Sequence, residues 1–164
     1  MIRSLFARPL RAGAAALTLS ACAGYSPMAL PPGTLAAEVR SQMGAPTASH
    51  TDGGGGHRLE YAKGPFGKHT FMVDLDTNDR LVRVQQVLTR QNFDTLRAGM
   101  SRDEVLYRIG QPSEARALPR RHRELWAYRF ESAPFCEWFL LTLDAGGQVV
   151  DTGYGPDPLC TPRD

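Results

Sequence analysis

An internal repeat constrains the fold of this chain more than any other feature of its sequence. Segment 33–47 aligns without a gap with segment 99–113, so that a glycine, a Glu-Val pair, a second glycine and a proline recur 66 positions further on. Segment 71–76 then aligns with segment 139–144 at an offset of 68 positions. We therefore expect one structural unit to occur twice, in tandem.

The second copy begins with the pattern of a helical hairpin. Ser101 and Glu104 have the spacing of a capping box at a helix start, and Gly110 followed by Pro112 indicates where that helix ends. Thr89 is expected to cap an additional, earlier helix. Three prolines between residues 27 and 32 precede the first copy, which is therefore expected to lack this additional helix.

Three apolar segments with turn residues between them follow the helix of each copy, which predicts a three-stranded antiparallel meander. The expected strands are 59–63, 69–75 and 81–87 in the first copy and 125–130, 136–143 and 148–154 in the second. The sequence therefore predicts an α+β fold made of two tandem units, each a helix with a three-stranded antiparallel sheet.

The first 21 residues have the pattern of a cleavable signal peptide. Arg3, Arg8 and Arg11 lie ahead of a small apolar run that ends at Ala21, and the run is shorter than the roughly 20 residues that a spanning helix needs. The sequence Leu-Ser-Ala-Cys then ends at Cys22 and is similar to the lipobox of bacterial lipoproteins. We expect cleavage before Cys22 and a lipid on its thiol, with an ordinary secretory leader as the alternative.

These features divide the chain into five parts. They are a leader at 1–21, a linker from the lipid anchor at 22–32, the first repeat at 33–88, the second repeat at 89–154 and a tail at 155–164. The residues that follow the leader suffice for one compact unit or two very small ones.

The charge of the chain argues against nucleic acid as a partner. The chain has 19 basic and 17 acidic side chains, and three of the basic ones belong to the leader, so the rest has a net charge of −1. A nucleic-acid-binding protein needs a retained basic face. We therefore expect no nucleic-acid partner.

Sequence motifs for metal binding or catalysis are also missing. His50, Asp52, His57 and His69 do not have the spacing of a metal site. No serine, cysteine or carboxylate pair has the surroundings of a known nucleophilic or acid–base motif. We expect no metal, no cofactor and no small-molecule substrate.

Two cysteines remain once Cys22 is assigned to the lipid. Cys136 and Cys160 form an even pair in an exported chain, which favours a disulfide between them. The alternative is a catalytic cysteine at Cys136, which would need a base such as His122.

The strands of the second copy have apolar residues on both faces. Trp138 and Leu140 alternate with Phe139 and Leu141, so the sheet has a second apolar face that either packs on the first repeat or binds a protein partner. Segment 119–123 is a basic loop that suits an acidic partner or phospholipid head groups. The candidate partner-binding residues are Trp126, Tyr128, Trp138, Leu140, Arg120, Arg121 and Arg123.

Segment 96–112, with its Gly-Met-Ser helix start and its Gly-x-Pro helix end, is followed at 125–129 by Leu-Trp-Ala-Tyr-Arg. Together these residues resemble the BamE (SmpA/OmlA) family of outer-membrane lipoproteins. The resemblance implies a non-catalytic accessory factor of β-barrel assembly or envelope integrity, anchored in the outer membrane and facing the periplasm. Its protein partners would belong to the β-barrel assembly machinery.

The tandem arrangement of two copies is similar to the β-lactamase inhibitor protein, in which two related units present a concave sheet surface. This second resemblance implies an inhibitor-like protein or a generic periplasmic adaptor. A cysteine hydrolase that uses Cys136 is the remaining alternative, and a disulfide at that residue would exclude it.

Overall fold

The computed structural model describes residues 30–51, 54–62, 67–132, 134 and 137–159. The predicted leader, the lipid site at Cys22 and the predicted disulfide between Cys136 and Cys160 lie outside the described residues. Within the described part, no helix is long and apolar enough to cross a membrane.

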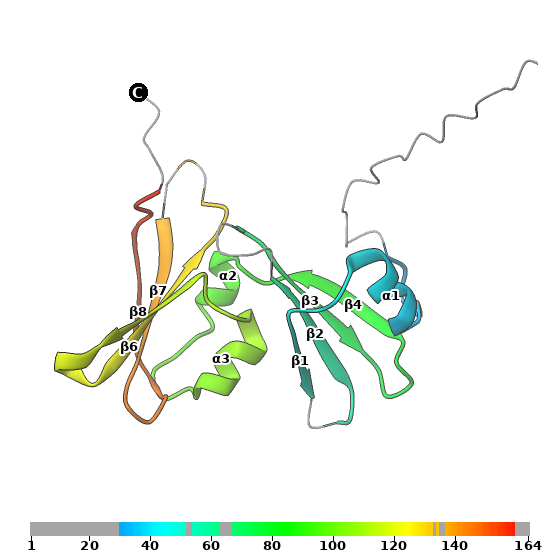
Figure 1. Cartoon of the computed structure of the whole chain (residues 1–164), viewed down its shortest axis with the longest axis horizontal. Coiled ribbons are helices and arrows are strands. Elements are labelled where there is room, and N and C mark those ends of the chain that lie inside the picture. The colour runs from blue at the N-terminus through cyan, green and yellow to red at the C-terminus, as the bar shows by residue number, and fades with distance from the viewer. Residues whose placement is uncertain (1–29, 52–53, 63–66, 133, 135–136, 160–164) are drawn as a thin grey trace, which may run out of the picture.

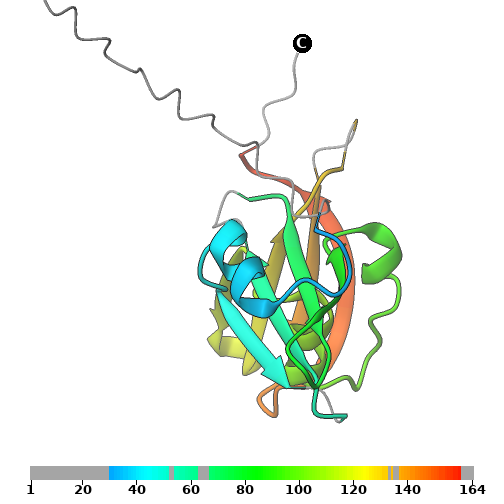
Figure 2. The same cartoon turned by 90° about the vertical axis from the view of Figure 1, so that its right-hand side faces the viewer.

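The first unit is a short helix followed by a four-stranded antiparallel sheet. Its elements are α1 (Ala36–Met43), β1 (Ala48–Thr51), β2 (His57–Ala62), β3 (Thr70–Leu75) and β4 (Leu81–Gln86), and the strands neighbour each other in chain order. The helix lies over the face of the sheet that is turned away from the second unit (Figures 1 and 2). Val39 of the helix is fully buried there against Leu59 and Val73.

The second unit has the same plan with an additional helix. Its elements are α2 (Arg90–Phe93), α3 (Arg102–Ile109), β5 (Glu114–Leu118), a 3-10 turn (Pro119–Arg121), β6 (Arg123–Arg129), β7 (Glu137–Leu143) and β8 (Val149–Pro156). The four strands again form an antiparallel sheet in chain order. The predicted α+β class and the two antiparallel sheets, each preceded by a helix, are confirmed.

The helix signals in the sequence are also confirmed. Thr89 accepts a hydrogen bond from the backbone N–H of Asn92 at the start of α2. The hydroxyl of Ser101 accepts from the backbone N–H of Glu104 at 3.2 Å, and the Glu104 carboxylate accepts from the backbone N–H of Ser101 at 2.8 Å. Gly110 ends α3 with a φ of +78°. Among the described residues, α1 is the sole helix ahead of the first sheet.

The predicted number of strands per sheet is wrong, because each sheet has four strands and not three. The missed strands are β1 and β5, which lie at the edges of their sheets. Both are short; β1 is mainly polar, and β5 alternates two alanines with Glu114 and Arg116 and is exposed at four of its five residues. They lack the apolar run by which a strand is recognised in a sequence, since they are held by backbone hydrogen bonds to a single neighbour.

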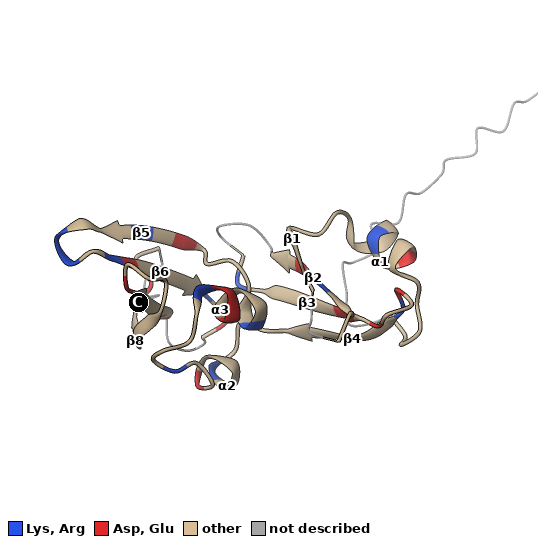
Figure 3. Ribbon diagram, turned by 90° about the horizontal axis from the view of Figure 1, so that it is seen from below, with Lys and Arg blue, Asp and Glu red and all other residues tan. Residues whose placement is uncertain are grey.

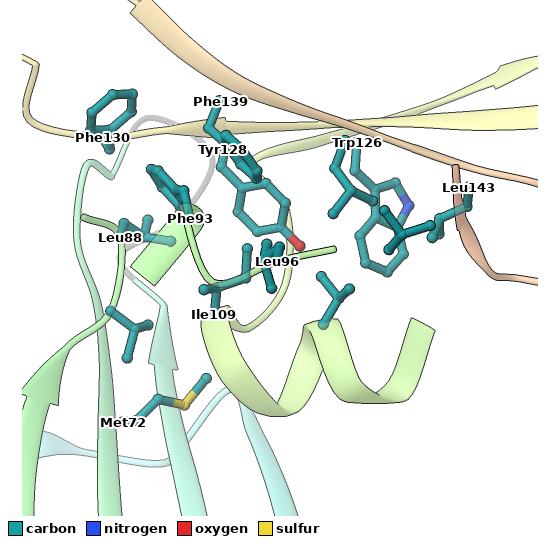
Figure 4. Close-up of a cluster of buried hydrophobic side chains, with 14 residues drawn as sticks. Met72, Leu88, Phe93, Leu96, Ile109, Trp126, Tyr128, Phe130, Phe139 and Leu143 are labelled. Carbon is teal, nitrogen blue, oxygen red and sulfur yellow. The ribbon is translucent and has the colours of Figure 1, made fainter. Parts of the chain in front are cut away.

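One of the two hydrophobic clusters spans the junction between the two units. Figure 1 shows α2 and α3 between the two sheets, and Figure 4 shows Met72 and Leu88 of the first unit beside Phe93 and Ile109 of these helices. All four side chains belong to one buried cluster that continues into the second sheet. The helices therefore join the sheets as well as covering the second one.

Polar contacts also connect the first sheet to α3. Glu60 of β2 is fully buried and accepts a hydrogen bond at 2.9 Å from the backbone N–H of Gln111, which follows α3. Arg58 donates to the carbonyl oxygen of Tyr107 at 2.8 Å and lies over the Tyr107 ring. The face of the first sheet opposite α1 therefore packs on α3, which leaves the far face of the second sheet uncovered by the first unit.

Candidate functional site

Two of the predicted partner-binding residues belong to the core. Trp126 and Tyr128 alternate along β6 on the side that faces α2 and α3, where Figure 4 shows them beside Phe139 and Leu143. Trp126 is 3 % exposed and Tyr128 is not exposed. The helices cover the face of the sheet to which these side chains point, so in this structure neither of them is exposed to a partner.

The opposite face of the second sheet, which we call the outer face, contains the other predicted aromatic site. Trp138 and Leu140 of β7 point to this side, with Ala127 of β6 directly opposite Leu140 and Arg129 opposite Trp138. In Figure 1 this side of the sheet is turned away from both helices and from the first unit. The outer face consists of Glu114, Arg116, Leu118, Arg123, Leu125, Ala127, Arg129, Trp138, Leu140, Thr142, Asp151, Gly153 and Gly155.

Two glycines leave part of the outer face without side chains. Gly153 lies opposite Leu140 and Gly155 lies opposite Trp138 across the β7–β8 pair. A Cβ at Gly155 would be 3.0 Å from Leu140, whereas a Cβ at Gly153 would meet nothing within 4 Å. The half-buried Leu140 side chain therefore lies over Gly155 and borders an open strip of backbone at Gly153, where an apolar side chain of another molecule has room to pack.

Trp138 forms a rigid border of this strip. Its ring stacks against the Arg129 guanidinium at 4.8 Å, and Arg129 donates to the Asp157 carboxylate at 2.8 Å. Burial raises the pKa of Asp157, but hydrogen bonds from the Leu159 amide and Arg129 outweigh it and lower that pKa below its usual value. Trp138 is only 7 % exposed, so the strip beside it, and not the indole itself, offers most of the accessible apolar surface.

The predicted basic loop is the turn of the β5–β6 hairpin. Arg120, Arg121 and Arg123 are exposed there, and none of them forms an ion pair with another described residue. Figure 3 shows these arginines in blue at the end of the molecule opposite α1. A shallow cavity of about 580 Å³ lies along the hairpin, lined by Arg116, Ala117, Leu118, Pro119, Arg120 and Arg121.

A second, polar cleft of about 670 Å³ lies where the first sheet meets α2 and α3. Two of its arginines are paired, since Asp74 accepts hydrogen bonds from both Arg58 and Arg83 at 2.5 Å. Burial raises the pKa of Asp74, but the hydrogen bonds and charges of these arginines outweigh it and hold the pKa below 3.8. His50 lies 3.3 Å from the buried carboxylate of Glu60. These contacts pair charged side chains within the first sheet, so Arg58, Arg83 and His50 each already have a partner.

Among the residues that the structure describes, no group of three His, Cys, Asp or Glu side chains could hold a metal ion. His50 and His69 each lie beside a single glutamate, Glu60 and Glu131 respectively.

Comparisons with known proteins find only remote similarity to this chain. No protein-family model matches it, and no curated protein matches it. The resemblance of segments 96–112 and 125–129 to the BamE family therefore has no support from a family model.

Two solved structures have remote similarity. One is the crystal structure of a "putative beta-lactamase inhibitor protein" from Streptococcus mutans, with 13% identity and a TM-score of 0.34 over 79% of this chain and 87% of that one. The other is an extracellular protein with an SCP domain from Bacillus anthracis str. Ames, with 12% identity and a TM-score of 0.30. The match covers 76% of this chain and 44% of that protein, so this chain spans less than half of its length. At such TM-scores neither structure indicates a shared site.

Sequence reasoning missed the open strip over β8 and the Arg129–Asp157 pair. The signal for the strip is the Gly-Tyr-Gly sequence at 153–155, in which two glycines lie two residues apart and so share a face. Its meaning depends on the pairing of Gly153 with Leu140, which the sequence does not contain.

Proposed function

We propose that this chain is a non-catalytic binding module that recognises a protein partner through the outer face of its second sheet. The observation that carries the proposal is that Leu125 and Leu140 are half-buried on a sheet face without a covering helix, while the opposite face of the same strands is buried. An apolar centre with a charged rim is the usual composition of a protein interface. Arg116, Arg123 and Asp151 provide that rim.

The proposed partner is a protein for a further reason. The open strip beside Leu140 is flat and continuous with the sheet surface, whereas small-molecule sites are usually enclosed cavities. An adaptor or an inhibitor-like protein uses a surface of this kind, and neither requires chemistry from the chain.

The same proposal includes attachment to a membrane. The Leu-Ser-Ala-Cys sequence ending at Cys22 supports a lipid anchor there, and two acyl chains hold a protein stably at a bilayer where one does not. We propose the outer membrane, facing the periplasm, as the location. An accessory role in β-barrel assembly is supported by segments 96–112 and 125–129 alone.

Site-specific photocrosslinking in intact cells tests the outer face. A photoreactive residue at Leu140 should crosslink to one protein of defined mass, and the same residue at Val82, an exposed apolar position on the first sheet, should not. Leu140→Ser should abolish a crosslink formed from Leu125 while the far-UV circular dichroism stays unchanged.

The identity of the crosslinked protein separates the candidate roles. A β-barrel assembly component would support the accessory role, and an unrelated envelope protein would support the adaptor. Equal crosslinking from Leu140 and Val82, or none from Leu140, would contradict the proposed function.

A further inference from the structure

We propose that the partner contributes an extended acidic segment that pairs with the free edge of β5, where the arginines of the β5–β6 hairpin bind its carboxylates. This inference rests on the proposed function and specifies the chemistry of the partner. It assigns a site to the arginines of the β5–β6 hairpin, which form no ion pair with another described residue.

Each sheet has two edge strands, and they differ in whether other parts of the chain form backbone hydrogen bonds with them. The edge of β4 is covered at its first residue, where Leu81 exchanges backbone hydrogen bonds with Gly33 and Thr34. The edge of β8 is covered in the same way at its first residue, where Val149 exchanges them with Gly99 and Met100. The edges formed by β1 and β5 have no such cover among the described residues.

Of these two edges, β5 is the more suitable for adding a strand. Four of its five residues are exposed, whereas His50 of β1 is directed into the junction toward Glu60. Ala115 and Ala117 are small and β5 contains no proline, so neither bulk nor a missing N–H blocks an incoming strand. Such an edge pairs with extended polypeptide through main-chain hydrogen bonds.

Charge defines what kind of strand would bind. Between Glu114 and Glu124 the hairpin has four arginines and no acidic residue. The cavity of about 580 Å³ at the hairpin is lined by the apolar residues Ala117, Leu118 and Pro119 and by Arg116, Arg120 and Arg121. This combination fits a glutamate side chain, whose aliphatic stem packs on the apolar residues while its carboxylate meets a guanidinium.

The arrangement favours a polypeptide over an anionic bilayer. Glu114 and Asp151 are exposed on the same outer face as Arg116 and Arg123. A planar anionic surface that approached this face would meet both acids, whereas a single strand along β5 passes Glu114 at one end only and stays away from Asp151 on β8, at the opposite edge of the sheet.

Peptide binding to the full chain tests the inference. The probe is a ten-residue peptide of alternating Glu and Val, and its control is the same peptide with Lys in place of Glu. The acidic peptide should bind and slow hydrogen–deuterium exchange of amides within 114–118, because added strand pairing protects the free N–H groups of the edge. The basic peptide should do neither.

Charge-removal variants add a quantitative control. Replacing Arg116, Arg120 and Arg121 together with glutamine should weaken binding of the acidic peptide about ten-fold, since each exposed ion pair contributes modestly. Replacing Arg40 and Arg108 with glutamine removes exposed charge elsewhere and should leave binding within about two-fold.

Three results would overturn the inference. The first is equal binding of both peptides, and the second is protection confined to amides outside 114–118. The third is that the acidic peptide does not bind while vesicles containing phosphatidylglycerol bind through the same arginines. If the acidic peptide fails to bind but the Leu140 crosslink forms, the edge site is ruled out and the proposed function stands. Protection of 114–118 without a Leu140 crosslink would remove the outer face and leave the edge site.

Discussion

At the scale of single residues, the two units approach each other closely at Gly110. A Cβ at this position would lie 2.8 Å from the Glu60 carboxylate and 3.0 Å from Thr70. Glu60 is fully buried and accepts a hydrogen bond from the Gln111 amide, so it has no room to move aside. Gly110 is therefore needed for its lack of a side chain as well as for its backbone conformation.

Gly110→Ala should lower the free energy of unfolding by about 4 kcal/mol, as the sum of backbone strain at φ +78°, ψ −167° and steric overlap with Glu60. Gly44→Ala is the matched control, because Gly44 ends α1 with nearly the same dihedral angles and a Cβ there would meet nothing within 4 Å. Its cost should be about 2 kcal/mol, from backbone strain alone. Urea unfolding followed by circular dichroism measures both, and equal losses would contradict the close approach.

At the scale of elements, one carboxylate connects three strands of the first sheet. Asp74 of β3 accepts hydrogen bonds from Arg58 of β2 and Arg83 of β4, and Arg58 continues to the Tyr107 carbonyl of α3. Four elements thus depend on one ionised side chain. The alternation of apolar residues predicts these strands, but only their register brings the three charged side chains together.

Because the pKa of Asp74 is lowered in the folded state, its contribution to stability is present above the unfolded pKa and is lost as the pH falls through the folded value. We expect the free energy of unfolding to decrease below about pH 4. Asp74→Asn should cost about 2 kcal/mol at pH 7 and reduce this acid dependence, as measured by urea unfolding across pH.

Asp151→Asn provides the comparison for this experiment, since Asp151 is exposed and forms no ion pair with a described residue. It should leave the acid dependence as in the parent chain. An unchanged slope in Asp74→Asn would argue that other carboxylates dominate acid unfolding.

At the scale of the whole molecule, the two repeats form one folding unit. Met72, Val87 and Leu88 of the first unit lie in the cluster that contains the core of the second. Separating the units would expose these side chains and leave Glu60 without its Gln111 partner. The unfolding of one unit should therefore unfold the other.

Leu59→Ala tests this coupling, because Leu59 belongs to the separate cluster under α1 and is 1 % exposed. The loss should be about 2–5 kcal/mol. Both tryptophans of the chain lie in the second unit, at 126 and 138. Tryptophan fluorescence and far-UV circular dichroism should shift to the same lower urea midpoint, whereas a fluorescence midpoint equal to that of the parent chain would show independent units.

The sequence by itself determined the two repeats, the helix caps and the alternation of the longer strands, because each depends on residues close together in the chain. Only the tertiary structure decided that Trp126 and Tyr128 are covered while Leu140 is open. An alternating pattern separates the two faces of a strand but does not specify which face a helix covers. The edge strands β1 and β5 likewise depended on tertiary pairing, since one neighbouring strand, and not an apolar run, holds each in place.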